Sequence, residues 1–525
     1  MDKTRHALRI AVGITMLAIL LTGVSSAAIL TVNASGGGDY TKIQDAINAS
    51  NNGDTIIVAA GTYKENVDVN KSVNLVGAGV GITTLNASNS YDHVFNITTN
   101  NVNISGFTIV GSISGSGIFF NRASFINISN NNVSNNREGI YADKYSNNNS
   151  IINNDVSNNN NYGIFLSSSS NNTLKGNNAS NNNNGIFLSS SNNNTLIGNM
   201  ASKNYHAFSL SNSSNNTLTG NTASNNDDRY PGIDISYSSN NNTLMGNNVS
   251  NNGRGISLRY SSNNTMSGNN ASNNIDCGIY LFYSSNNTLT GNTASNNNYG
   301  IILESSSNNK IYNNIFNNTI KIYFLLSNID TWDTTRQSGT NIIGGLYLGG
   351  NFWGKPDGTG FSQICADVDN DGICDSAYVL DANNIDYLPL AMNFNSTGRV
   401  HNINKDTNYF TIQSAIDDAN TGDEIHVDSG TYHENVNVNK RLILRGFGMP
   451  VVDAVENGSA ITLAVDGMVL DGFTATGASG SYPNAGIKVA SNDNTLSGNN
   501  ASSNNNYGIL LLSSSNNTLS GNLAI

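Results

Sequence analysis

Apolar residues recur along this chain in two columns, each with a period of about 22 residues. Within a repeat they alternate with polar residues, as at Ile164 and Leu166 or at Ile186 and Leu188. Alternation is the period of a β-strand, so the pattern predicts short strands. The first column contains Ile151, Leu174, Leu196, Leu218, Leu244, Met266, Leu289 and Ile311. The second contains Ile118, Ile140, Ile164, Ile186, Phe208, Ile233, Ile256, Ile279 and Ile301.

The polar residues between these strands exclude a helical repeat. They are mostly Asn, Ser, Gly and Thr, which are poor helix formers and good turn formers. A leucine-rich repeat of similar length would need several Leu and a helical arm in each unit, and these are missing. We therefore predict an all-β chain that forms a right-handed parallel β-helix of about 22 residues per coil. A Gly precedes most members of the second column, and we expect these glycines to turn corners with φ above zero.

The low charge of the repeats agrees with stacked coils. Equivalent side chains of successive coils lie about 4.8 Å apart, so stacked like charges would repel one another. Charged residues make up only 11% of the chain. An Asn amide both donates and accepts, so stacked Asn residues can form a hydrogen-bonded ladder. We predict such a ladder at Asn172, Asn194, Asn216, Asn242, Asn264, Asn287 and Asn309.

An opening segment occurs twice, at a constant offset of 369 residues. The segment around Ile43 and Ile47 has the apolar spacing of a short helix, and Ile412 and Ile416 repeat it. Thr41 and Gln44 have the spacing of a capping box. A helix there would cover the open end of a stack of coils. We therefore predict two tandem β-helices, each with a short N-terminal capping helix.

These patterns divide the chain into four parts. Residues 1–27 have basic residues before an apolar run and small residues after it, which predicts a secretory signal peptide, with a retained anchor as the alternative. Residues 28–341 form the first β-helix. Residues 342–398 form a closing segment, in which Trp353 seals the core together with Trp332. Residues 399–525 form a second β-helix that ends in mid-coil, which predicts a truncated chain or end-to-end association with another chain.

The repeated Asn-Asn-Thr-Leu-x-Gly-Asn motif and the paired opening segments resemble the NosD-type and pectin-lyase-like right-handed β-helix families of archaeal cell-surface proteins. The resemblance covers nearly all of residues 29–525 and implies the fold. It also implies copper handling, because NosD is associated with the maturation of a copper enzyme. Copper would need imidazole or sulfur ligands, and these are scattered along the chain at His93, His206, His401, His426 and His433.

A tyrosine column follows the strands of the second column. Tyr237, Tyr260 and Tyr283 share one position on successive coils, provided that a corner turns them outward. Asp234, Arg259 and Glu304 are expected beside them. Aromatic faces with neighbouring charged groups suit a sugar chain, so we predict a carbohydrate-binding surface, with core filling or cross-strand packing as the alternative. A longer coil with Asp227, Asp228, Arg229 and Tyr230 adds a loop nearby.

An acidic loop in the closing segment has the spacing of a calcium site. Oxygen ligands at alternate positions and a Gly at the sixth match the first half of a calcium-binding loop, although Tyr378 stands where a bidentate Glu is usual. An acidic turn without metal is the alternative. A disulfide between Cys365 and Cys374 would close this loop. The predicted ligands are Asp367, Asp369, Asp371 and Asp375.

The remaining features limit the function. A net charge of -12 disfavours binding to nucleic acid, and no segment beyond the signal resembles a transmembrane helix. Cys277 stands in a corner column and is expected to be a surface thiol or an intermolecular link. We predict an exported cell-surface protein with a structural or polysaccharide-binding role. The competing prediction is a polysaccharide lyase, hydrolase or epimerase, but we identify no catalytic acid and base pair. The carboxylates are isolated, at Glu138, Asp143, Asp155, Asp234 and Glu304.

Overall fold

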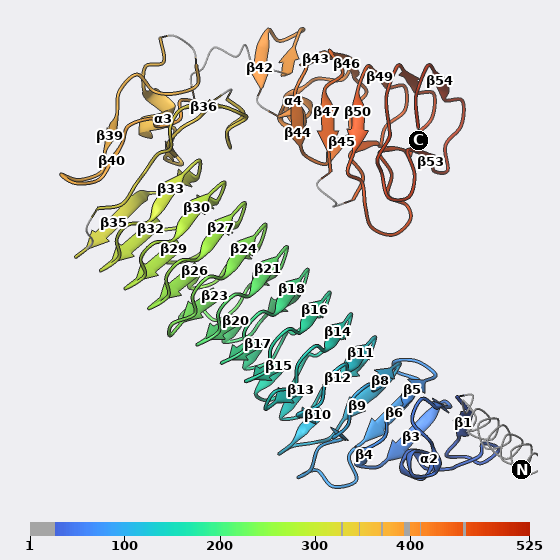
Figure 1. Ribbon diagram of the computed structural model, residues 1–525. Coiled ribbons are helices and arrows are strands. Elements are labelled where there is room, and N and C mark those ends of the chain that lie inside the picture. Colours follow the sequence, from blue (N-terminus) through green and yellow to red (C-terminus); the bar gives the residue numbers. More distant parts are fainter. Residues whose placement is uncertain are drawn as a thin grey trace, which may run out of the picture. The chain divides into compact units, whose positions relative to one another are not determined.

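The computed structural model describes residues 27–326, 329–345, 347–368, 371–392, 400–409, 411–454 and 458–524. These residues belong to two compact units that divide between residues 394 and 395 (Figure 1). Apart from Ala27, the predicted signal peptide lies outside the described residues. Nowhere in the described part of the chain is there a helix long and apolar enough to cross a membrane.

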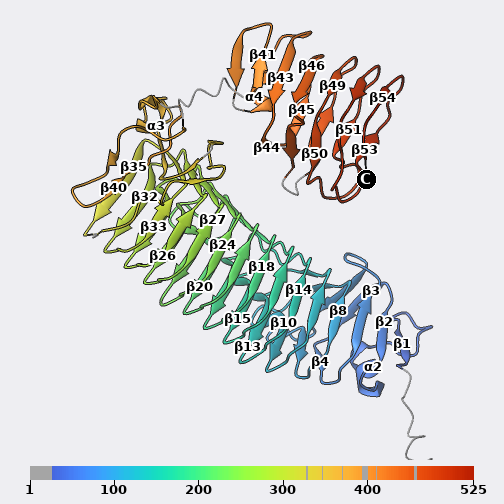
Figure 2. The same cartoon turned by 45° about the horizontal axis from the view of Figure 1, so that its top comes forward.

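The first unit is a parallel β-helix, as the repeat predicts. Both apolar columns pair in register, for example Ile164 with Ile186 and Leu174 with Leu196. Strands of successive coils lie side by side in long sheets (Figure 2). The 12-stranded sheet, which carries the predicted site, consists of β4 (Val67–Val69), β7 (Phe95–Ile97), β10 (Ser116–Asn121), β13 (Glu138–Asp143), β15 (Tyr162–Ser167), β17 (Asn184–Ser189), β20 (His206–Ser211), β23 (Pro231–Ser236), β26 (Arg254–Arg259), β29 (Cys277–Phe282), β32 (Tyr299–Glu304) and β35 (Ile320–Leu325).

Two further faces complete each coil. A 13-stranded sheet contains β1 (Ile29–Val32), β2 (Thr55–Val58), β5 (Asn74–Gly77), β8 (Asn103–Ser105), β11 (Asn127–Ser129), β14 (Ser150–Ile152), β16 (Thr173–Lys175), β18 (Thr195–Ile197), β21 (Thr217–Thr219), β24 (Thr243–Met245), β27 (Thr265–Ser267), β30 (Thr288–Thr290) and β33 (Lys310–Tyr312). The third face has four strands, β3 (Gly61–Lys64), β6 (Thr83–Asn86), β9 (Thr108–Val110) and β12 (Asn132–Val133), and then seven, β19 (Met200–Ser202), β22 (Thr222–Ser224), β25 (Asn248–Ser250), β28 (Asn270–Ser272), β31 (Thr293–Ser295), β34 (Ile315–Asn317) and β38 (Phe352–Gly354).

Hydrogen-bonded ladders run along the corners between these faces. The predicted asparagine ladder is present: the backbone N–H of Asn172 donates to Asn194 Oδ1 at 2.8 Å, and the Asn172 amide donates to the same oxygen at 3.1 Å. Two more asparagine ladders and a serine ladder accompany it, for example at Asn177, Asn182 and Ser191. Because each rung satisfies a buried backbone donor of one coil with a side chain of the next, the ladders fix the register of the stack.

The glycines before the second column do not turn corners with positive φ, so that prediction is wrong. Instead they allow close approach between coils. A Cβ at Gly163 would lie 2.6 Å from the carbonyl oxygen of Gly185, and one at Gly185 would lie 2.5 Å from that of Ala207. Positive φ values fall instead on other turn residues, including Asn171 and Asn193 and the glycines Gly176 and Gly198.

A short helix covers the first coil of each unit, as predicted: α2 (Ile43–Ala49) and α4 (Ile412–Asp418). The predicted capping box of Thr41 and Gln44 is wrong, because the N-cap of α2 is Lys42 and its side chain makes no capping bond. Glu65, in the turn between β3 and β4, accepts the backbone N–H groups of Ile43 and Gln44 at 2.9 and 3.1 Å.

In the second unit, a glutamate also caps the N-terminus of the short helix. Glu434 accepts the N–H groups of Ile412 and Gln413 at 2.8 and 3.0 Å. At the other end of each helix, Lys71 and Lys440 donate to its last carbonyl groups. A carboxylate at the N-terminus and an ammonium at the C-terminus of a helix are both stabilising, which explains why these residues occur in both opening segments.

The closing segment covers the last coil of the first unit. It contains α3 (Phe361–Ile364) and the antiparallel pair β39 (Tyr378–Val379) with β40 (Ile385–Asp386). Its strand β37 (Tyr347–Leu348) pairs antiparallel with β36 (Gln337–Ser338), which precedes the segment. Trp332 and Trp353 are fully buried. The Trp353 indole donates to Asp386 at 2.8 Å, and burial raises the pKa of this carboxyl to about 7. The predicted disulfide between Cys365 and Cys374 is present.

Cys277 is fully buried, so the expected surface thiol is wrong. It packs with Tyr280 and Ile302 on the outer side of the 12-stranded sheet, where flanking side chains cover it. Burial raises the pKa of this thiol. A buried, protonated thiol is a poor nucleophile and a poor partner for an intermolecular disulfide.

The second unit is a shorter stack with the same three faces. A seven-stranded sheet contains β41 (Val400–Asn402), β42 (Thr407–Tyr409), β43 (Glu424–Asp428), β46 (Ile443–Phe447), β49 (Val469–Asp471), β52 (Thr495–Ser497) and β54 (Thr518–Ser520). The others contain β44 (Thr431–His433), β47 (Val451–Asp453) and β50 (Thr474–Thr476), and β45 (Val436–Val438), β48 (Ile461–Leu463), β51 (Ile487–Val489) and β53 (Ile509–Leu511). Leu496 and Leu519 pair in register, as the repeat predicts.

Candidate functional site

The tyrosine column lies at the corner where strands β23, β26 and β29 end. Tyr237, Tyr260 and Tyr283 have φ values of 53°, 51° and 47°. This left-handed conformation turns the backbone after the strand, so the three side chains point away from the core. They are 60%, 49% and 51% exposed. The corner that the outward orientation requires is therefore present.

The rings of the tyrosine column form a continuous surface with their neighbours. Tyr260 and Tyr283 are stacked, with centroids 5.2 Å apart and planes 10° apart. Phe282 meets Tyr283 edge-on at 4.6 Å. The Arg259 guanidinium lies over the Tyr237 ring, 5.9 Å from its centroid. The column thus offers flat apolar faces next to a cationic group.

Asp234 is buried beneath Arg259. Its carboxylate accepts two hydrogen bonds from that guanidinium, at 3.0 Å from Nε and 2.5 Å from Nη2. The Asp234 side chain is 3% exposed and that of Arg259 is 36% exposed. Asp234 therefore positions Arg259, and Arg259 is the member of the pair that can reach a ligand.

Glu304 is also engaged by a neighbour. The Tyr280 hydroxyl donates to Glu304 Oε2 at 2.7 Å, while the Arg254 guanidinium lies 4.4 Å from the centroid of the Tyr280 ring. Arg254 in turn forms an ion pair with Asp276 at 2.8 Å. Burial raises the pKa of Tyr280, and the hydrogen bond to Glu304 raises it further. This hydroxyl stays protonated and holds the carboxylate in place.

A second aromatic group on the same sheet was missed from the sequence. A ring ladder consisting of His93, Phe119, Tyr141, Phe165 and Phe187 runs along the outer face, with successive centroids 4.1 to 5.3 Å apart. Tyr162 stacks on Phe165 at 4.5 Å. The sequence does contain an indication of this ladder. A residue between two inward apolar positions points outward on a strand, and Phe165, between Ile164 and Leu166, is such a residue.

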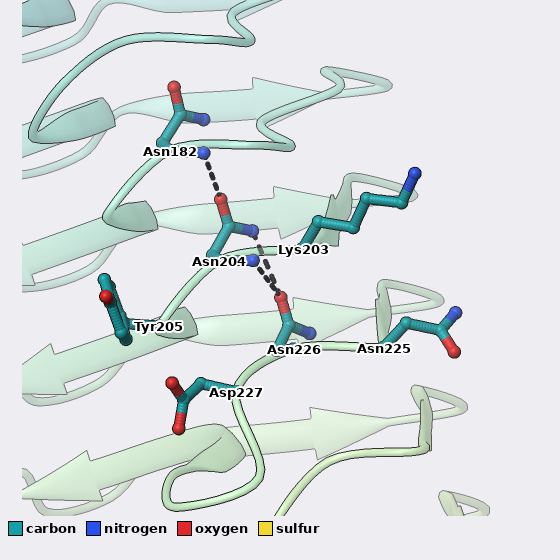
Figure 3. A pocket seen from close by; sticks show the side chains of 7 residues that line it. All are labelled: Asn182, Lys203, Asn204, Tyr205, Asn225, Asn226 and Asp227. Atoms are coloured by element: carbon teal, nitrogen blue, oxygen red, sulfur yellow. Dashed lines mark hydrogen bonds between the residues drawn. The ribbon is translucent and has the colours of Figure 1, made fainter.

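A small polar pocket of about 360 Å³ lies at the corner before strands β20 and β23, at the opposite end of β23 from Tyr237. Along its wall the asparagine ladder runs from Asn182 through Asn204 to Asn226 (Figure 3). Tyr205 and Asp227 lie on one side of this ladder, and Lys203 and Asn225 lie on the other.

The longer loop is held together by its own charges. Arg229 forms a bidentate pair with Asp227, with both distances at 2.8 Å. Its guanidinium lies 5.5 Å from the ring centroids of both Tyr205 and Tyr230. The loop is therefore internally paired.

The acidic loop in the closing segment makes an internal turn in its described part. Asp367 accepts the N–H groups of Asp371 and Gly372, both at 3.0 Å, and Asp375 accepts that of Val368. Arg336 forms an ion pair with Asp371 at 2.8 Å. Asp369 lies outside the described residues. Calcium binding stays a prediction, and any ion would compete with Arg336 for the Asp371 carboxylate.

These features define the class: a parallel β-helix repeat protein with an exposed aromatic corner. The chain matches the family described as "Periplasmic copper-binding protein (NosD)" over residues 47–229 and 197–358. Together these ranges cover more than half of its 525 residues. The chain therefore belongs to the NosD family.

A "Cell surface glycoprotein" of Methanothermus fervidus is 37% identical over 123 residues, which are 23% of this chain and 20% of the relative. The match thus spans a fifth of the relative's length. Solved structures are also similar. The Azotobacter vinelandii mannuronan C-5 epimerase AlgE6 A-module has a TM-score of 0.48 at 18% identity, over 55% of this chain and 91% of that one. A GH87 alpha-1,3-glucanase catalytic domain in complex with tetrasaccharides has a TM-score of 0.43 at 16% identity, over 59% and 66%. At such identities the likeness concerns the fold.

The described residues of this chain do not fit a copper centre. Within the described ranges, no three His, Cys, Asp or Glu side chains come close enough to hold one metal ion. His206 packs against Tyr230, and His93 stacks on Phe119. Cys277, a soft donor, is buried. We therefore derive no copper chemistry for this chain.

Proposed function

We propose that this chain is an exported β-helix protein of the cell surface that binds a polysaccharide along its tyrosine column. Its relative is named a cell surface glycoprotein, and a predicted secretory signal precedes the first coil. The tyrosine column, Arg259 and Glu304 form the binding surface. Sugar rings stack on the aromatic faces, while the charged groups hydrogen-bond to hydroxyls.

The observation that carries this proposal is that the fold has no need of tyrosine at these corners. Equivalent positions on other coils include Ser190, Asn212 and Ser305, with φ values of 51°, 51° and 49°. A small polar residue therefore meets the backbone requirement. A bulky residue with positive φ is strained, so three consecutive exposed tyrosines there point to a ligand.

The hydrogen bonds that the carboxylates of the site already make favour binding over catalysis. Glycoside hydrolysis needs two carboxyl groups flanking the same bond. Asp234 is held by Arg259 and Glu304 by Tyr280. Within the described part of the site, both predicted carboxylates are therefore already hydrogen-bonded to a neighbouring side chain.

The test is a glycan array with the protein from residue 28 onward, with and without calcium. The variant Tyr260→Ser places at this corner the residue found at positions 190 and 305, so its fold should persist. We expect binding of a polysaccharide that falls about tenfold in this variant, equivalent to ~1.4 kcal/mol. Tyr387→Ser, which removes a 64% exposed tyrosine of the closing segment, is the matched control.

Failure of the folded protein to bind any glycan would leave a structural surface protein as the better account. Appearance of unsaturated, shortened or epimerised products on incubation with the bound glycan would instead support the lyase, hydrolase or epimerase alternative. Equal losses in Tyr260→Ser and Tyr387→Ser would place the binding away from the tyrosine column.

A further inference from the structure

A second pocket lies at the end of the first β-helix, where β35 meets the closing segment. Its volume is about 490 Å³. Lys321 and Ile322 line it from the last strand, and Lys355, Phe361, Ile364 and Tyr378 line it from the closing segment. We call it the end pocket. It combines two ammonium groups with aromatic and aliphatic walls.

Lys321 occupies a position that is glycine in the preceding coils. It aligns with Gly300, where a Cβ would lie 2.5 Å from the Lys321 carbonyl oxygen. Gly255 is crowded in the same way by the carbonyl oxygen of Gly278, its aligned residue in the next coil. β35 is the last strand of its sheet, so no further strand crowds Lys321. Space thus permits a side chain here, but nothing in the stacking of coils calls for a long cationic one.

Both ammonium groups interact electrostatically with Asp357, but neither forms an ion pair with it. Of the ion pairs formed by the described residues, none includes Lys321 or Lys355 within 4 Å. The Lys321 ammonium lies 4.8 Å from the centroid of the Tyr378 ring and 3.4 Å from its hydroxyl oxygen. Burial and, to a smaller extent, the charge of Lys355 together lower the pKa of Lys321 to about 8, against a still smaller opposite effect of Asp357.

We propose that the end pocket binds an organic carboxylate, whose charge is held by Lys321 and Lys355 and whose body packs on Phe361 and Tyr378. Two half-buried ammonium groups near one another repel, and an anion between them relieves that repulsion. Two point charges beside an apolar wall suit a carboxylate that carries a ring-sized body. The carboxylate can belong to a free acid or to an acidic residue of a polysaccharide, and the test separates these sources.

Tryptophan fluorescence reports directly on this pocket. The chain has two tryptophans. The ring centroids of Trp353 and Tyr378 are 5.2 Å apart, and those of Trp332 and Trp353 are 5.8 Å apart. The emission is titrated at pH 7 and low salt with sodium glucuronate, with polygalacturonate and with glucose, which lacks the charge. We expect saturable changes with the two carboxylates and none with glucose. Tighter binding of polygalacturonate would assign the site to a polysaccharide, and equal binding would assign it to a free acid.

The variants identify the charges. Lys321→Met is expected to weaken glucuronate binding at least tenfold, and Lys355→Met severalfold. Lys310→Met is the matched control, since that ammonium lies over the Tyr312 ring outside the pocket. The affinity for glucuronate should also fall between about pH 8 and 10, because Lys321 loses its proton and its positive charge there.

Equal responses to glucose and glucuronate, or unchanged affinity in Lys321→Met, would overturn the proposal. If Lys321→Met melts early, Lys321→Arg retains the charge and is expected to retain binding, and a loss of binding in folded Lys321→Arg and folded Lys355→Arg alike would also count against it. The end pocket and the tyrosine column are separate, so Tyr260→Ser should leave these titrations unchanged.

Discussion

The outer face of the 12-stranded sheet is built in two different ways along its length. Over β10 to β17 it carries the ring ladder, whose members lie on the sheet and are partly covered by one another. Over β23 to β32 it carries ion pairs and hydrogen-bonded pairs, and the tyrosine column stands at the corner beside it. One backbone scaffold therefore supports a packed aromatic surface and an exposed one.

The difference shows how position within a coil decides what an aromatic residue does. A ring in mid-strand stacks on its counterparts above and below, since equivalent positions lie about 4.8 Å apart, and so contributes to stability. A ring at the left-handed corner stands half exposed, so it is available to a ligand. The two regions should respond to mutation in opposite ways.

The largest effect is expected from breaking the buried pair beneath the corner. Arg259→Met leaves the Asp234 carboxylate, whose side chain is 3% exposed, without its cation. An unpaired buried charge is strongly destabilising, so we expect a loss of about 3 kcal/mol in the free energy of unfolding, measured by urea denaturation.

Arg229→Met is the control for that prediction. It removes a cation from the solvent-exposed pair with Asp227, and should leave the urea midpoint unchanged. A similar destabilisation in both variants would show that the burial of Asp234 is not what makes its ion pair important.

Substituting serine for one ring of each kind separates their roles. Phe165→Ser removes a ring that stacks on Tyr141, Tyr162 and Phe187, and should cost about 2 kcal/mol of stability while glycan binding is unchanged. Tyr260→Ser should reduce glycan binding about tenfold with little change in stability. The column that contains Phe165 already has a serine at position 209, which pairs with Phe187, so the backbone there accepts serine. Loss of binding in Phe165→Ser would extend the binding surface onto the ring ladder.

A smaller effect is expected from calcium at the closing segment. If the acidic loop binds calcium with a dissociation constant near 1 mM, 10 mM calcium should stabilise the first unit by about 1.4 kcal/mol. Thermal unfolding with calcium and with chelator measures this. Arg336→Met removes the cation paired with Asp371 and should strengthen the response. Asp371→Asn should abolish it, and an unchanged response in that variant would contradict a site that includes Asp371.

Much of the fold could be predicted because stacked coils place equivalent residues in contact. The columns through Ile186 and Leu196 and the asparagine ladder at Asn172 follow directly from the period. The candidate site was reached less completely. The tyrosine column was found by its spacing, yet the roles of its neighbours depended on contacts between coils, as with Asp234 under Arg259. The ring ladder was missed although alternation points Phe165 outward.

By itself, then, the sequence determined the repeat, the β-helix and the two capping helices, because periodicity and alternation depend only on which residues recur and at what spacing. Only the tertiary structure decided which groups meet across coils. Glu65 caps α2 from the turn after β3, Gly163 leaves room for the next coil, and Cys277 is covered by its neighbours on the sheet. Such contacts join residues whose pairing is set by the stacking distance and by corner geometry, and neither is visible in one repeat taken alone.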